Sequence, residues 1–470
     1  MLTYSPIDHK GTSLYQYLYE CIRDDILNGA LKSGEKLPSK REFAKNLGIS
    51  VITVEGAYSQ LLAEGYIYSE PRRGFFVSDI YGQIQSDTKK SDLTTIPKKD
   101  EFLFDLVSTR TLTDNFPFTT WTRLMRKLIN EEAPSLMQTP PAGGVMELRC
   151  AIAKHLRDFR QINVSPEQII IGAGSEYLYG LLVQLLGRDK LYALETPGYQ
   201  KVRRVYSAQD VEVVSIPMDS EGIRPDELRE SHADILQISP SHHFPTGIVT
   251  PVNRRYELLA WANESKGRYI LEDDFDSELR LSGSPIPALF SIDVSDKVIY
   301  VNTFTKTLSP TIRISYMVLP ASLLPVFYEK LGFYSCTVSN FEQYTLAHFI
   351  SEGFFEKHIN RLRKHYRSLR DDLMQALTAR FPKGMIEIKE EEAGLHFLLK
   401  INTFLTGDKL KHLAKENGIR ISFLSDYVDA PDETPANTDH TAVLSYSGLS
   451  AEDISSVVDR LYEAWDDCLT

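Results

Sequence analysis

The chain has 470 residues, of which 42% are hydrophobic and 25% charged, and its net charge is −12. This length and composition predict about three folding units with packed cores, and they exclude disordered, collagen-like and coiled-coil proteins. No apolar run approaches the ~20 residues of a bilayer span, and the N-terminus lacks the pattern of a signal peptide. The four cysteines show neither paired nor zinc-site spacing, so we expect a cytoplasmic protein in a reducing compartment, without a metal ion.

The negative net charge argues against a nucleic-acid partner, but its distribution reverses locally. Residues 1–80 carry nine Lys or Arg against ten Asp or Glu, so the acidic excess lies almost wholly in the rest of the chain. Within residues 32–45, five basic side chains stand against only two acidic ones. Such a run usually marks a solvated helix face, and the elements around it favour a DNA-binding unit instead.

The pattern of residues 1–80 predicts a winged helix-turn-helix. Apolar residues at helical spacing predict a first helix over 14–27. Ser39 and Ser50 each precede a further short amphipathic helix, as N-cap residues do. Two strands then flank a basic turn at 71–74 and form the wing. Two short helices joined by a tight turn are typical of this DNA-binding motif.

The rest of the chain predicts an α/β fold. Residues 81–100 are polar and are predicted to form a linker. Beyond them, apolar β-rich runs alternate with helical patterns, which indicates a large domain over 101–330 with a largely parallel sheet. The runs are 168–171, 190–194, 211–216, 235–238, 268–271, 297–301 and 314–319. A helical connection and three further runs, at 385–389, 394–400 and 442–446, suggest a small α+β subdomain over 331–470.

Residues 31–77 resemble the GntR-type winged helix, through LPSKR at 37–41, LGIS at 47–50, LAEG at 62–65 and the basic wing. The resemblance implies that the third helix lies in the major groove of DNA, with its first turn at the base edges. The DNA-binding residues that it implies are Ser39, Lys40, Arg41, Ser50, Val51, Ile52, Thr53, Arg72, Arg73 and Gly74. The family often has Arg at Val51. An apolar side chain contacts a thymine methyl but makes no bidentate guanine bond, so the operator sequence stays open.

Four motifs in the second part of the chain follow the order found in a family of cofactor enzymes. They are ETPGYQ (195–200), SPSHHFPTG (239–247), YILEDDFDSE (269–278) and VNTFTKTLSP (301–310). This set resembles the fold-type I aminotransferases, which use pyridoxal 5′-phosphate (PLP). Together with the GntR-like head, it makes the chain similar to the MocR/GabR family of transcriptional regulators and, in architecture, to its PdxR subgroup. The resemblance implies a PLP cofactor, double-stranded operator DNA as partner, and a homodimer.

Three residues take roles at the PLP ring by this resemblance. Lys306 forms the imine with the aldehyde, because a lysine partly removed from water beside a cationic ring loses its proton readily. Asp273 keeps the ring nitrogen protonated, whereas Asp274 and Asp276 lie off the motif position. Tyr199 stacks on the flat ring.

The phosphate of PLP is expected at a helix N-terminus beside a cation, again by resemblance. The residues of this phosphate cup are Gly174, Ser175, Glu176, Thr303 and Arg313. The aminotransferase Asn that holds the ring hydroxyl is replaced, and either His242 or His243 is the candidate substitute. Phe275 stands where GabR-like chains often have Tyr, so that hydroxyl is absent.

The sequence does not identify the effector. An amino-acid effector would need a fixed cation for its carboxylate. The loop 422–440 has no Lys or Arg, although GabR-like sequences carry an Arg close to the place of Ser425-Asp426. A second GabR-type Arg is Lys201 in this chain. Other candidate anion contacts are Arg110, Arg203 and Arg204, of which the last two are more simply placed on a helix surface.

Three functions remain open at this point. The first is a regulator that senses PLP itself and controls vitamin B6 synthesis, as the PdxR subgroup does. The second is a regulator that responds to GABA or another amino acid or amine, and the third is a working aminotransferase. The missing loop Arg favours the first function, so we expect sensing without catalytic residues or turnover. Activation and repression are equally compatible with the sequence.

Overall fold

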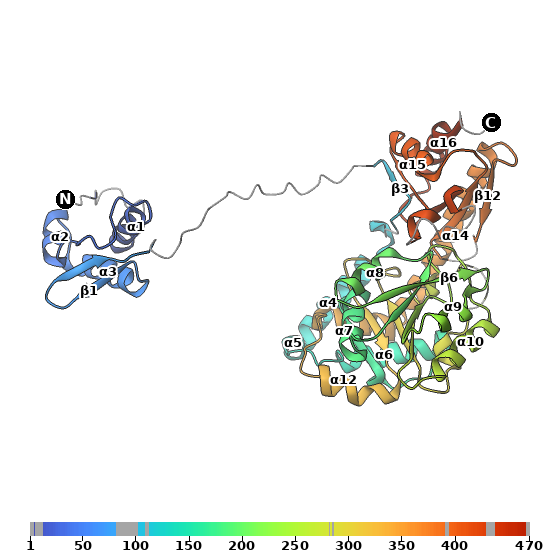
Figure 1. Cartoon of the computed structure of the whole chain (residues 1–470), viewed down its shortest axis with the longest axis horizontal. Coiled ribbons are helices and arrows are strands. Elements are labelled where there is room, and N and C mark those ends of the chain that lie inside the picture. The colour runs from blue at the N-terminus through green and yellow to red at the C-terminus, as the bar shows by residue number, and fades with distance from the viewer. Residues whose placement is uncertain are drawn as a thin grey trace. The chain divides into compact units, whose positions relative to one another are not determined.

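The computed structural model describes residues 4, 13–80, 102–108, 112–281, 283, 286–390, 394–428 and 438–466. The chain forms two compact units, Met1–Lys99 and Asp100–Thr470, which are described separately (Figure 1). The predicted linker at 81–100, Arg110 and the central part of the loop 422–440 lie outside the described residues.

The first unit, called the head below, is a winged helix-turn-helix. Its elements are α1 (Leu14–Leu27), α2 (Lys40–Leu47), α3 (Val51–Ala63), β1 (Ile67–Glu70) and β2 (Gly74–Val77). The hydroxyl of Ser39 accepts a hydrogen bond from the Glu42 backbone N–H, and that of Ser50 accepts one from Thr53, so both predicted N-caps are present. Gly48, at φ 65°, ends α2 in the left-handed conformation that allows the tight turn.

The second unit is built on an eight-stranded sheet in the order β4-β11-β10-β9-β8-β5-β6-β7. Its strands are β4 (Ile169–Gly172), β5 (Tyr192–Thr196), β6 (Val213–Asp219), β7 (Gly222–Ile223), β8 (Ile235–Ile238), β9 (Tyr269–Asp273), β10 (Val298–Thr303) and β11 (Ser315–Val318). All seven predicted runs are strands of this sheet. Strands β6, β5, β8, β9 and β10 pair in parallel, which confirms the predicted fold class. Strand β11 is antiparallel to β10, because residues 304–314 are too few for a crossover connection.

Helices cover both faces of this sheet (Figure 1). They are α4 (Phe118–Glu131), α5 (Ala133–Leu136), α6 (Met146–His155), α7 (Ser175–Leu186), α8 (Gln200–Ser207), α9 (Pro225–Glu230), α10 (Val252–Asn263), α11 (Leu289–Ile292), α12 (Leu324–Leu331) and α13 (Asn340–Ser351). Strand β4 shows the two faces, since Ile169 and Ile171 pack with α4, α6 and α13, whereas Ile170 packs with α7 and α12. A continuous apolar run is therefore required of each parallel strand.

The long helix α14 (Phe354–Arg380) leads into a small subdomain. Its antiparallel sheet has the order β12-β13-β16-β15. The strands and helices of the subdomain are β12 (Ile386–Lys389), β13 (His396–Ile401), α15 (Gly407–Glu416), β14 (Ile419–Arg420), β15 (Ser422–Phe423), β16 (Thr441–Ser445) and α16 (Asp453–Trp465). The short strand β3 (Phe104–Asp105) pairs with β14, so the start of the second unit belongs structurally to its C-terminal end. None of the helices described has the length and hydrophobicity to cross a membrane.

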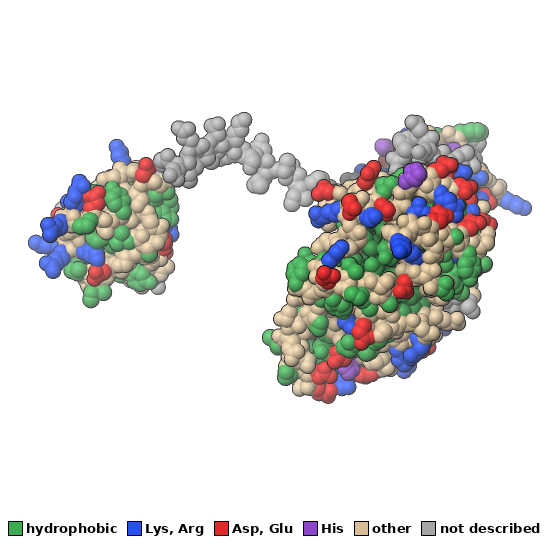
Figure 2. Space-filling model, turned by 60° about the horizontal axis from the view of Figure 1, so that its bottom comes forward, with side chains coloured by type: hydrophobic (Ala, Val, Ile, Leu, Met, Phe, Trp, Pro, Cys, Tyr) green, Lys and Arg blue, Asp and Glu red, His purple; other side chains and the backbone are tan. Residues whose placement is uncertain are grey.

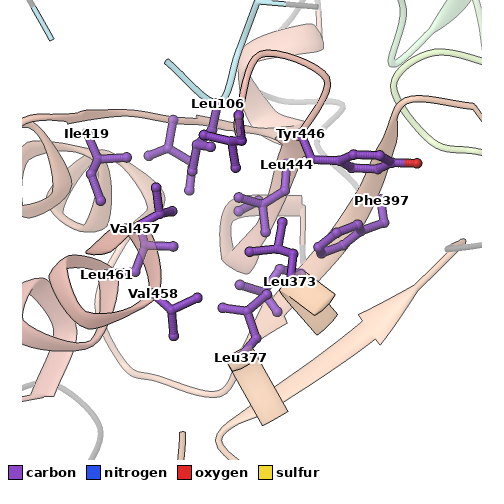
Figure 3. Packing of buried hydrophobic residues seen from close by; sticks show 14 of the residues in the cluster. Leu106, Leu373, Leu377, Phe397, Ile419, Leu444, Tyr446, Val457, Val458 and Leu461 are labelled. Carbon is purple, nitrogen blue, oxygen red and sulfur yellow. The ribbon is translucent and has the colours of Figure 1, made fainter. Parts of the chain in front are cut away.

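Helix α16 packs its apolar side against α14 and the sheet of the small subdomain. Val457, Val458 and Leu461 contact Leu377 and Leu444 in one buried cluster (Figure 3). This cluster replaces water around each side chain with close-packed carbon, which stabilises the subdomain.

We predict that Leu461→Ala lowers the free energy of unfolding of the second unit by about 2–5 kcal/mol, because Leu461 is fully buried and its truncation leaves a cavity. Phe404→Ala is the matched control, since Phe404 is almost fully exposed in the same subdomain. The three tryptophans, Trp121, Trp261 and Trp465, all lie in the second unit, so denaturation followed by their fluorescence reports this unit. An equal loss in both variants would contradict the assignment of this core.

Candidate functional site

The predicted cofactor residues converge at one edge of the large sheet. Asp273 is the last residue of β9, and Lys306 follows the end of the neighbouring strand β10 in the turn 304–308. The two strands are parallel, with Val301 opposite Asp273, so their carboxyl ends meet at the same edge. Ligands of open α/β sheets bind at this edge. Tyr199 reaches it from the segment after β5.

Asp273 and Lys306 each have a pKa that moves toward neutrality. Burial raises the pKa of Asp273 to about 6, while the hydroxyl of Tyr179 donates a 2.5 Å hydrogen bond to its Oδ2. Burial lowers the pKa of Lys306, against the opposing charges of Asp276 and Asp273. A lysine with a lowered pKa presents more free amine for attack on an aldehyde. A buried carboxylate is costly unless it is paired with a positive charge, and a protonated ring nitrogen would supply that charge to Asp273.

Tyr199 presents an aromatic face at this edge. It is the N-cap residue of α8, and it is 51% exposed. The ring of Phe244 meets it edge-on, with centroids 5.7 Å apart. About half of Tyr199 is therefore exposed at this edge, which is compatible with the predicted stacking role.

The residues of the predicted phosphate cup meet where α7 begins. Gly174 has φ 95°, and a Cβ at this position would lie 2.3 Å from Nη2 of Arg313. Only glycine therefore allows the guanidinium to lie this close to the first turn of α7. Arg313, itself in the left-handed region at φ 53°, donates to the carbonyl of Ala173 at 3.2 Å and to Glu176 at 2.7 Å. A cation over a helix N-terminus, where Ser175 is the first helical residue, is an anion-binding arrangement.

Thr303 and Glu176 take different positions in the cup. The hydroxyl of Thr303 is buried at the end of β10 and accepts hydrogen bonds from Ser315 and the Thr305 backbone. It therefore braces the turn that carries the lysine. The carboxylate of Glu176 forms ion pairs with both Arg313 and Lys201.

The two candidate histidines differ in whether a ring nitrogen is left without a hydrogen-bond partner. His243 uses both: Nδ1 contacts Thr246 Oγ1 at 2.7 Å and Nε2 lies 3.4 Å from Glu195, while burial lowers its pKa to about 3. His242 bonds Asp276 through Nδ1 at 2.8 Å, and its buried Nε2 has no hydrogen-bond partner in the part of the chain described. An unpartnered buried nitrogen is costly unless a ligand or water meets it. Of the two histidines, the geometry favours His242 as the ligand contact.

The sequence analysis missed an aromatic cluster that joins the two subdomains here. Phe244 contacts Tyr199, His396 of β13 at 5.0 Å and Tyr427 at 5.3 Å, all as ring pairs. His396 also stacks on His242 at 4.9 Å. The sequence around each of these residues does not predict the contacts, because a single aromatic residue in an apolar run is usually a core residue.

Asp274, the alternative to Asp273, is engaged elsewhere. It forms a 2.8 Å ion pair with Arg160, both side chains being almost fully buried, and accepts a 2.5 Å hydrogen bond from Tyr300. Asp276 is paired with His242. Asp273 is thus the carboxylate of this motif that stands beside both Tyr179 and the lysine turn.

The two lysines nearest the positions expected to hold an effector carboxylate are both engaged in ion pairs. Asp426 pairs with Lys411 and also accepts a hydrogen bond from the Phe423 backbone N–H. Lys201 pairs with Glu176. On α8, Arg203 bonds Ser215 and Arg204 is exposed, as expected for helix-surface residues.

The head presents a second candidate site. Figure 2 shows Lys and Arg side chains gathered on one side of it. A groove of about 910 Å³ lies between the start of α2 and the wing, and its lining includes Lys36, Ser39, Arg72, Arg73 and Gly74. Lys40 is paired with Glu55, Arg73 with Glu70, and Arg41 is exposed.

The first turn of α3 is exposed although it is apolar. Ile52 is 80% and Val51 42% exposed, while Thr53 bonds the Ser50 hydroxyl. Exposed aliphatic side chains at the start of a recognition helix fit contacts with base edges, thymine methyls in particular. The head therefore has the two features expected of the predicted DNA-binding surface, namely cations beside a groove and an exposed first turn of α3.

Comparisons with known proteins support the division of the chain into these two parts. Residues 14–77 match the family of bacterial regulatory proteins called gntR, and residues 108–424 match aminotransferase class I and II. The HTH-type transcriptional regulator YdeL of Bacillus subtilis is 36% identical over 455 residues, which cover 96% of each chain. The probable rhizopine catabolism regulatory protein MocR of Rhizobium meliloti is 29% identical, over 96% of this chain and 94% of its own.

Two further proteins extend the comparison. The HTH-type pyridoxine biosynthesis transcriptional regulator PdxR of Corynebacterium glutamicum is 29% identical, over 89% of this chain and 90% of its own. Among solved structures, the multiple substrate aminotransferase of Thermococcus profundus superposes with a TM-score of 0.68 at 24% identity, over 82% of this chain and 96% of its own, which shows the fold. The chain therefore belongs to the MocR/GabR family of PLP-dependent transcriptional regulators, in which a GntR-type helix-turn-helix is joined to an aminotransferase-like domain.

Proposed function

We propose that this regulator responds to PLP itself, bound at Lys306, and that it controls vitamin B6 synthesis. The observation that carries the proposal is Asp426. At the place where an effector carboxylate would need a cation, the chain has an anion already paired with Lys411. The likeness to PdxR over most of both chains supports the same assignment.

The residues at the sheet edge have separable tasks in binding the cofactor. When bound, PLP supplies an aldehyde that condenses with a lysine amine. Lys306 provides that amine, Asp273 holds a proton on the ring nitrogen, and Tyr199 fixes the plane of the ring. Arg313 and the start of α7 hold the phosphate, and His242 offers its free Nε2 to the ring oxygen.

We further propose that the protein is a cytoplasmic homodimer that senses rather than transaminates. The resemblance to fold-type I enzymes, whose sites usually form between two subunits, supports the dimer. A dimer places two heads on DNA, so its operator should contain two half-sites.

An amino-acid or amine effector is the second candidate, and Lys201 favours it. This lysine lies two residues after Tyr199, at the edge of the same site, and carries the charge that a carboxylate needs. Its pairing with Glu176 counts against this candidate.

We predict that Lys306→Ala loses the visible absorption band that PLP gives with the wild-type protein. In the wild type, borohydride reduction should fix the cofactor to the peptide that contains Lys306, as mass spectrometry would show. Lys266→Ala, which removes an exposed lysine before β9, should leave the band intact. A normal spectrum of Lys306→Ala would overturn the assignment.

We predict that DNA binding falls steeply with salt despite the net charge of −12, because phosphate contacts release counterions. Arg41→Ala and Arg73→Ala should each weaken binding and reduce the salt slope by about 1. Arg23→Ala, on α1 of the same head and paired with Asp24, is the matched control. Fluorescence anisotropy of labelled operator DNA measures both quantities, and a flat salt dependence would refute the proposed interface.

We predict that PLP alone changes the affinity for operator DNA, and that GABA or common amino acids added to the PLP form change it little. The reason is that the two lysines nearest the expected carboxylate positions, Lys411 and Lys201, are already paired with Asp426 and Glu176. Mobility-shift titrations with PLP, and with PLP plus each amine, separate the two candidates. An amino acid that shifts both the spectrum and DNA binding, while PLP alone does neither, would put the second candidate first.

A further inference from the structure

The carboxylate of Glu176 lies between two cations of the phosphate cup. Its Oε2 accepts a 2.7 Å hydrogen bond from Nη2 of Arg313, and its Oε1 accepts one from Nζ of Lys201. The three side chains are 34%, 45% and 52% exposed, in the order Glu176, Arg313, Lys201. Burial raises the pKa of Glu176, but the two hydrogen bonds outweigh this effect and lower the pKa below its usual value. The group is therefore an anion at neutral pH.

Glu176 occupies the position that an incoming anion would take. It is in the first turn of α7, where the helix dipole favours negative charge, and the first helical bond closes only at Leu178, to the Gly174 carbonyl. The Arg313 nitrogen that Glu176 binds is also the one that lies over Gly174. A phosphate that binds at the same N-terminus meets the same guanidinium and the repulsion of a neighbouring carboxylate.

We propose that Glu176 is a specificity-determining internal anion, which Arg313 exchanges for the phosphate of the ligand. This inference rests on the proposed function, since it concerns the phosphate end of the PLP site. Lys201 keeps the released carboxylate paired, so the exchange leaves no isolated charge. No bond to the ligand is made or broken by Glu176.

The exchange makes the cup selective for a doubly charged phosphate ester. A single carboxylate offers Arg313 no more than Glu176 already does, whereas a phosphate dianion offers two negative charges and three acceptor oxygens. The exchange also reaches the ring end of the site, because Lys201 lies in the first turn of α8, directly after Tyr199 and Gln200. Occupation of the cup is thereby linked to the residue that stacks on the ring.

The test compares ligands with and without the phosphate. Glu176→Gln keeps the size of the side chain and removes its charge. We expect it to bind PLP threefold to tenfold more tightly than the wild type in absorbance titrations, and to let inorganic phosphate compete with PLP at a threefold to tenfold lower concentration. Pyridoxal, which has the same ring without phosphate, should bind both proteins within twofold of each other.

Glu227→Gln is the matched control. Glu227 lies in the first turn of α9, forms a 3.0 Å pair with Arg224 and is 37% exposed, so its neutralisation alters a similar pair outside the cup. It should leave PLP binding unchanged. Lys201→Gln should act in the opposite direction to Glu176→Gln and weaken PLP binding, because Glu176 then has Arg313 as its one remaining partner in the cup.

Unchanged or weaker PLP binding by Glu176→Gln would overturn the inference, and so would an equal gain in affinity for pyridoxal. Either result leaves the proposed function standing if the wild type still forms its absorption band with PLP. Absence of that band in the wild type would count against the proposed function itself, which keeps the two failures distinguishable.

Discussion

The candidate cofactor site depends on the short connection between β10 and β11. Residues 304–314 cannot carry a helix across the sheet, so β11 must return antiparallel beside β10. One loop consequently holds Lys306 at its start and Arg313 at its end, both at the edge where β9 delivers Asp273. The spacing of Lys306, Arg313 and Asp273 is thus set by the pairing of β9, β10 and β11, which suits the proposed role of this edge in holding a rigid ligand.

Buried charge beneath this edge makes the arrangement expensive to disturb. Glu272 accepts hydrogen bonds from the backbone of Leu289 and Phe290, and its burial raises its pKa to about 7. Asp274 is neutralised by Arg160, which also donates to Ser241 and to the Ile286 carbonyl. Each charge is paired or hydrogen-bonded, because an unpaired buried charge would cost several kcal/mol. The end of β9 is held in place by these partners, while Asp273, which lies between Glu272 and Asp274 and is less buried than either, accepts its hydrogen bond from Tyr179.

Much of this could be predicted from the sequence, because the information is local. The helix over 14–27, the caps at Ser39 and Ser50 and the strand runs depend on periodicity and on N-cap chemistry, and they are where the patterns predict them. The partners of Glu176 and the choice between His242 and His243 could not be predicted in this way. Both depend on contacts between residues far apart in the chain, such as Arg313 with Glu176 or His396 with His242. The antiparallel direction of β11 could be predicted in part, since the short connection from β10 excludes a parallel crossover once the two strands are known.

The central claim is that occupancy of the Lys306 site sets DNA affinity. A ligand can shift a conformational equilibrium only through its different affinities for the two states, so site occupancy and DNA binding must change together. The most direct measurement titrates PLP into a single sample of protein and labelled operator DNA, with the absorption band and the DNA anisotropy recorded at every step. Coincident midpoints, with both changes lost in Lys306→Ala, are the predicted result. A band that saturates while the anisotropy stays constant would contradict the account.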